Sequence, residues 1–149
     1  MGTRSYIAQQ TTTGIIAVYC HWDGYPSHNG RILRDHYSNA EKLAQLIAHG
    51  DMSILGPEIG SQHDFNARAD GECTFYHRDR GEKWEHVKPQ TYKTTKELLK
   101  YAGKSGAEYV YLYDGETWYY FARGAQYFGK SDGSPFSAMR LLPYLEEDA

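Results

Sequence analysis

An aromatic hairpin pattern near the end of the chain constrains the fold more than any other sequence feature. Residues 108–113 and 116–121 are two runs of alternating, tyrosine-rich sequence, and Asp114-Gly115 lies between them. This dipeptide favours a two-residue hairpin turn because it accepts positive φ angles. Tyr109, Tyr111 and Tyr113 would share one face of the first strand. We expect them to pack in the core or at a subunit interface, and a base-stacking platform is the alternative.

The other segments predict further hairpins and several helices. Strand-like runs cover residues 4–9, 15–21, 72–78 and 84–88. Helices are expected over 27–37, 38–50, 94–103 and part of 136–145, and residues 51–70 read as a loop. Ser38 with Glu41, and Thr94 with Glu97, match the capping box that begins a helix. Hairpins dominate this order, so we predict one α+β domain over residues 1–149, with an antiparallel sheet of about six strands and helices packed on one face.

Composition and charge exclude several classes of protein. The chain is 40% hydrophobic and 23% charged, which is typical of a globular domain. Its net charge of −3 argues against a protein that coats nucleic acid through general electrostatic attraction. There is no apolar run of membrane-spanning length and no apolar segment of the signal-peptide type, so we expect a cytoplasmic protein without membrane contact. Cys20 and Cys73 lie in apolar, strand-like runs and are expected to be buried free thiols.

The densest group of polar and aromatic residues is the segment from His21 to Gly30. It lies where a predicted strand passes into a predicted helix, and backbone N–H groups at such a junction attract anions. Trp22 and Tyr25 offer flat faces for a base or sugar, and Asn29 adds an amide. His21 and Asp23 would lie on one strand face and could hydrogen-bond. The alternative is that these residues only close the end of the strand over the core.

A second group, at residues 77–82, contains Arg78, Asp79 and Arg80. Two guanidinium groups in a tight turn can bind phosphate or carboxylate through paired hydrogen bonds. The alternative is a solvated hairpin tip with internal ion pairs. Arg4, at the start of the first strand, is a further donor.

Motifs for metal, cofactor or nucleophilic chemistry are missing from the sequence. The seven histidines show no His-x-x-x-His pair, and there is no Cys-x-x-Cys, so we predict no metal site. Glycine-rich phosphate loops and the Gly-x-Ser-x-Gly elbow are also absent, and we predict no cofactor and no catalytic residue.

Three motifs together resemble a family of small proteins of tailed bacteriophages and prophages. They are Met1-Gly2-Thr3-Arg4-Ser5, the run CHWDGYPSHNG at 20–30, and Arg78-Asp79-Arg80-Gly81-Glu82. The resemblance implies a setting more than an activity: an accessory phage gene expressed in the cytoplasm of a bacterial host. Many such genes counter host defence, some by sequestering nucleotide-derived signals.

The residues and the resemblance lead to one hypothesis. The chain binds and sequesters a small phosphorylated, nucleotide-like ligand, without cleaving it, in a pocket formed between identical subunits. The ligand-binding residues would be Arg4, His21, Trp22, Asp23, Tyr25, Asn29, Arg78, Asp79 and Arg80. One alternative is a small hydrolase or lyase that acts on a nucleotide through His21 and Asp23. Another is an inhibitor that binds a host protein through the tyrosines of the aromatic hairpin.

Overall fold

The computed structural model describes residues 2–67, 69–123 and 140–141, and it has a mixed α+β architecture. The strands are β1 (Ser5–Thr11), β2 (Gly14–Cys20), β3 (Met52–Ile54), β4 (Thr74–Phe75), β5 (Gln90–Tyr92), β6 (Tyr109–Tyr113), β7 (Trp118–Ala122) and β8 (Arg140–Leu141). The helices are the wide turn η1 (Pro26–Gly30), α1 (Arg31–His36), α2 (Ala40–Ala48), α3 (Tyr76–Arg80), α4 (Trp84–Val87) and α5 (Thr95–Lys104).

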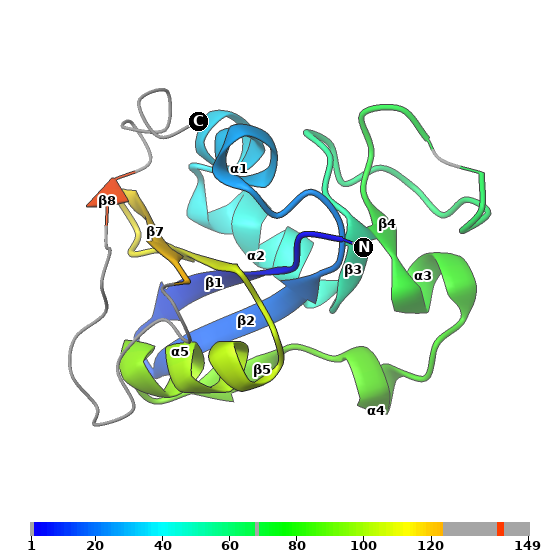
Figure 1. Ribbon diagram of the computed structural model, residues 1–149. Helices are drawn as coiled ribbons and strands as arrows, with labels where there is room; N and C mark the ends of the chain where they lie inside the picture. The colour runs from blue at the N-terminus through cyan, green and yellow to red at the C-terminus, as the bar shows by residue number, and fades with distance from the viewer. Residues whose placement is uncertain (1, 68, 124–139, 142–149) are drawn as a thin grey trace.

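The sheet is mixed, and its strands run in the order β4-β3-β2-β1-β6-β7-β8, with β5 paired to β2 (Figure 1). The predicted hairpins β1–β2 and β6–β7 are antiparallel, and so are the pairs β3–β4, β2–β5 and β7–β8. The pairs β1–β6 and β2–β3 are parallel. The prediction of a purely antiparallel sheet is therefore wrong in part, because η1, α1 and α2 carry the chain across to β3 as a crossover connection.

Helices cover both faces of the sheet rather than one (Figure 1). One core packs Leu33 of α1 and Leu43 of α2 against Ile7 and Val18. The second packs Leu98 and other residues of α5 against the opposite face. The first five residues of β1 are buried, as expected for a strand between two helical layers. The prediction that helices pack on one face only is therefore wrong, because the apolar side of α5 packs on the second face of the sheet.

Several local predictions are confirmed. The N-terminal and aromatic hairpins form at the expected places, and Gly115 has the positive φ of 104° that its turn requires. α5 begins with the predicted capping box of Thr94 and Glu97. α2 also forms, but its cap is Asn39, whose side chain accepts from the backbone N–H of Lys42, rather than Ser38.

The region from 72 to 88 differs most from its prediction as a hairpin. Only Thr74 and Phe75 form a strand, and the chain then turns directly into α3. The Asp79 carboxylate accepts a hydrogen bond of 2.8 Å from the backbone N–H of Phe75, which fixes this turn. Residues 84–87 form α4, and the presumed loop contains β3.

Three remaining predictions concern the tail, the thiols and the membrane. The expected helix within 136–145 lies outside the described residues, except for Arg140 and Leu141, which form β8 instead. Cys20 and Cys73 are buried free cysteines, as predicted. Within the described part of the chain, no helix is long and apolar enough to cross a membrane.

Candidate functional site

The segment 21–30 is fastened to the rest of the fold mainly by Asn29 and Gly24. Asn29 is fully buried, and its amide donates to the Trp22 carbonyl at 3.2 Å and to the sulfur of Cys20 at 3.3 Å. Gly24 lies against the first strand, where a Cβ would be 2.6 Å from the Thr3 carbonyl oxygen. Asn29 therefore holds the loop in place and presents no free amide to a ligand.

His21 and Asp23 do not form the predicted pair. β2 ends at Cys20, and Asp23 adopts a left-handed conformation with a φ of 57°. The strand geometry that would put both side chains on one face is therefore lost before Asp23. Nδ1 of His21 shares a hydrogen bond of 2.7 Å with the Tyr19 hydroxyl. The Asp23 carboxylate instead accepts a long hydrogen bond of 3.4 Å from Tyr25. The hydrolytic alternative thus lacks the histidine–carboxylate pair on which it depended.

Arg4 acts electrostatically on Tyr19 and His21, which hydrogen-bond to each other, and Trp22 contacts His21; we call these four residues the Arg4 surface. The register Ser5↔Cys20 and Tyr6↔Tyr19 brings the start of β1 beside the end of β2. Burial lowers the pKa of His21, and the positive charge of Arg4 lowers it further. The ring of Trp22 meets the ring of His21 edge-on at 4.8 Å and is 36% exposed.

The guanidinium of Arg4 is the notable group of this surface. Among the described residues it has no ion pair and no hydrogen-bond partner. Its Nη1 atom lies 3.3 Å from the place where a Cβ would stand on Gly106, so the glycine leaves room for it. His21 keeps its second ring nitrogen, Nε2, for another partner. An unpaired cation beside a ring nitrogen and an exposed indole can bind an anionic group attached to a flat ring.

Tyr25 belongs to a different environment. It is 38% exposed, its ring meets that of His28 edge-on at 6.0 Å, and the negative charge of Asp23 raises its pKa. The described contacts therefore place Tyr25 beside an acidic group and not beside an arginine.

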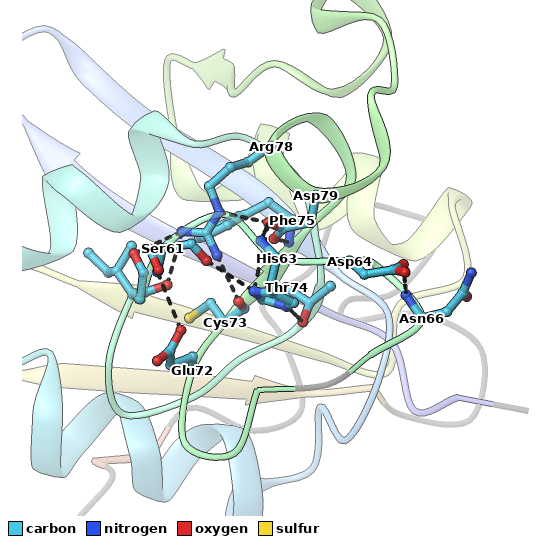
Figure 2. A network of polar contacts seen from close by, with 12 residues as sticks. Ser61, His63, Asp64, Asn66, Glu72, Cys73, Thr74, Phe75, Arg78 and Asp79 are labelled. Carbon is cyan, nitrogen blue, oxygen red and sulfur yellow. Dashed lines mark hydrogen bonds and ion pairs between the residues drawn. The ribbon is translucent and has the colours of Figure 1, made fainter.

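Arg78 and Asp79 form the centre of a polar network that holds the 55–73 loop against α3 (Figure 2). Arg78 donates to the Asp79 carboxylate and to the carbonyls of Ile59, Gly60 and Cys73 at 3.0–3.1 Å. Four of its five N–H bonds are thus used. Burial of the Asp79 carboxyl opposes its ionisation, but hydrogen bonds from Arg78 and from the backbone N–H groups of Phe75 and His63 still hold its pKa below the usual range. The two residues stabilise the fold and leave little capacity for a ligand.

Figure 2 also shows His63 between Thr74 and Asp79, an arrangement that superficially resembles a catalytic triad. Nε2 of His63 lies 3.0 Å from the Thr74 hydroxyl. Nδ1, however, hydrogen-bonds to the Ser61 carbonyl at 3.0 Å and is 3.8 Å from the Asp79 carboxylate. Thr74 is 1% exposed. A substrate cannot reach its hydroxyl, so we interpret the group as part of the loop attachment.

Arg80 remains near the surface but already has partners. Its guanidinium forms an ion pair of 2.8 Å with Glu82 and stacks over the rings of Phe65 and Tyr76 at 4.8 and 4.6 Å. Of the three predicted arginines, Arg4 is therefore the best placed to receive an anion.

The structure also brings together residues that the sequence reasoning missed. Burial raises the pKa of Tyr6, Tyr19 and Tyr92, and the negative charge of Asp51 adds a smaller contribution to all three. Burial raises the pKa of Asp51 itself to about 6. The pairing of Tyr6 with Tyr19 could have been inferred from the N-terminal hairpin, but Asp51 reaches this face only through the crossover to β3.

The described residues contain no group of three or more His, Cys, Asp or Glu side chains arranged to hold a metal ion. No protein-family model, curated protein or solved structure matches the chain.

Proposed function

We propose that this protein binds a small phosphorylated, nucleotide-like ligand on the Arg4 surface and sequesters it without converting it. The observation that carries the proposal is the Arg4 guanidinium, which has no ion pair or hydrogen bond among the described residues and whose charge acts on His21, the ring that Trp22 contacts. A phosphate would be held by Arg4 and by an N–H of His21, and a base would stack on Trp22.

Sequestration is favoured over hydrolysis by the partners of His21. Its Nδ1 is engaged by the Tyr19 hydroxyl, and burial raises the pKa of Tyr19 to about 12, so this partner stays neutral at pH 7. A neutral phenol orients the imidazole but does not stabilise its protonated form as a carboxylate would.

The tyrosines of the aromatic hairpin give little support to the alternative of a host-protein inhibitor. Tyr111 is fully buried and Tyr113 is 4% exposed, because both pack in the core beneath α1 and α2. The resemblance to phage proteins supplies the proposed setting, which is an anti-defence role in the bacterial cytoplasm. An assembly of identical chains is also part of the proposal.

Native mass spectrometry of the protein purified from bacterial cells is the first test. We expect a multiple of the chain mass plus a phosphorylated ligand, which heat denaturation releases unchanged. Arg4→Ala and Trp22→Ala should lose the ligand. Arg34→Ala and Trp84→Ala are matched controls, because Arg34 forms a surface ion pair with Asp35 and Trp84 is 36% exposed, like Trp22.

A titration followed by NMR tests the site even if the purified protein is empty. Adenosine and uridine 5′-monophosphates should shift the signals of His21 and Trp22 and raise the pKa of His21, because a bound phosphate favours the imidazolium. The proposal is wrong if neither nucleotide moves these signals, or if Arg4→Ala responds as the unmodified protein does. Recovery of a chemically altered nucleotide would show an enzyme instead.

A further inference from the structure

Asp51 is held in a fixed position where three elements meet. Its backbone N–H donates to the carbonyl of Val87 at the end of α4, at 2.7 Å, and its carbonyl accepts from Tyr76 at the start of α3, at 3.3 Å. The preceding residue, Gly50, has a φ of 81°, and a Cβ there would collide with the Val87 carbonyl oxygen. These backbone contacts therefore fix the position of the Asp51 side chain on the α5 face of the sheet.

The carboxylate is only partly satisfied in that place. One oxygen accepts a hydrogen bond of 2.9 Å from the backbone N–H of Tyr19. Among the described residues no lysine, arginine or histidine forms an ion pair with Asp51, although burying a carboxylate is costly without a cation. The second oxygen is left without a protein partner in the part of the chain that the structure describes.

Tyr19, whose backbone N–H binds this carboxylate, belongs to a chain of four tyrosine rings in contact, and with Asp51 they form what we call the Asp51 cluster: Asp51, Tyr6, Tyr19, Tyr92 and Tyr101. The ring of Tyr6 packs edge-on against those of Tyr19 and Tyr101, with centroids 5.6 and 6.1 Å apart. The ring centroids of Tyr92 and Tyr101 are 5.8 Å apart. Tyr101 is 48% exposed, so the cluster is open to solvent on the side of α5.

An unpaired carboxylate beside several aromatic rings attracts one kind of ligand. Organic cations are attracted to the negative faces of the rings and to the carboxylate at once, whereas anions are repelled by both. A divalent metal ion would need several oxygen ligands, and the cluster supplies one carboxylate. We propose that the Asp51 cluster binds an organic ammonium group.

This inference does not depend on the proposed nucleotide site. The Arg4 surface needs the positive charge of Arg4, and the Asp51 cluster needs the negative charge of Asp51. The two share Tyr19, but through different atoms, since the backbone N–H of Tyr19 serves Asp51 and its hydroxyl serves His21. Arg4→Ala should therefore remove nucleotide binding and leave ammonium binding intact.

Tetramethylammonium and methylammonium are the direct probes, titrated at constant ionic strength against sodium chloride. NMR signals of Asp51, Tyr19 and Tyr92 should shift and saturate with both cations and stay unchanged with sodium. Asp51→Asn should weaken binding about tenfold or more, because it removes the charge and keeps the shape. Asp35→Asn, the same change at an exposed carboxylate, is the control and should bind normally.

Tyr101→Ala provides a second variant, since this exposed side chain can be removed with little risk to folding. It should weaken tetramethylammonium binding about two- to fivefold. The proposal is overturned if the ammonium ions cause no saturable shift, if sodium acts equally well, or if Asp51→Asn binds as tightly as the unmodified protein. Spermidine and N-acetyl-lysine methylamide then identify the source of the ammonium group, a free polyamine or a lysine side chain, by which binds more tightly.

Discussion

Asp51 should destabilise the fold at neutral pH, and Asp51→Asn should therefore make the protein more stable. Burial raises the pKa of the carboxyl from 3.8 to about 6, and the hydrogen bond from Tyr19 only partly offsets this. Asparagine has the same shape and keeps an oxygen that can accept from Tyr19. It therefore resembles the protonated acid, which is the form that the folded protein prefers.

The size of the effect follows from the shift. A pKa raised by about 2 units corresponds to roughly 3 kcal/mol between the charged and neutral forms, which is an upper limit because water still reaches the group. The folded protein holds this proton more tightly than the unfolded chain does. The cost is therefore absent below about pH 4, grows as the pH rises to about 6, and is constant above that.

Urea unfolding of both proteins at pH 4.5 and pH 7.5 measures this directly. We expect Asp51→Asn to raise the free energy of unfolding by about 1–3 kcal/mol at pH 7.5 and by much less at pH 4.5. The difference between the two proteins cancels the titration of other groups, such as His21 and His49. Asp35→Asn, the same substitution at an exposed ion pair, is the control and should change the free energy of unfolding by less than about 1 kcal/mol. A gain that is equal at both pH values, or a loss at pH 7.5, would refute the reasoning.

Four further predictions concern the elements that position these residues. Arg78→Ala should lower the free energy of unfolding by about 2–5 kcal/mol in urea unfolding, because it leaves the buried Asp79 carboxylate and several carbonyls without their donor, whereas Arg80→Ala should cost less than about 1 kcal/mol. Thr94→Ala should cost about 1 kcal/mol by removing the cap of α5, measured in the same assay. Gly50→Ala should lower the thermal midpoint and weaken ammonium binding, because its Cβ meets the Val87 carbonyl and displaces Asp51. Tyr19→Phe should alter the pKa of His21 measured by NMR but leave ammonium binding nearly unchanged, since the ring and backbone N–H remain.

The sequence predicts the structure well where local signals decide it. Asp114-Gly115 sets the aromatic hairpin, where the Asp114 carboxylate also accepts from the backbone N–H groups of Glu116 and Thr117. The capping box of Thr94 and Glu97 likewise sets the start of α5. Both are interactions among residues at most four apart, which a sequence displays directly.

Prediction fails where distant residues decide the structure. Residues 72–78 resemble a strand in the sequence, but Arg78 finds carbonyl partners in a loop some twenty residues earlier, and Asp79 turns the chain into α3. The parallel pairing of β1 with β6 joins segments about a hundred residues apart. Arg78 therefore looks like a ligand-binding arginine in the sequence, although the structure uses it for packing.

Tyr19 links the two proposed sites and explains why the candidate residues gather on this part of the sheet. Its backbone N–H, in β2, donates to the Asp51 carboxylate beside the start of β3. Its hydroxyl hydrogen-bonds to His21, two residues further along the chain. A destabilising carboxylate and a guanidinium that has no partner in the described part of the chain thus flank one tyrosine. Natural proteins retain such costly groups mainly where function requires them, so we expect activity to be concentrated here and not at the better-satisfied Arg78 network.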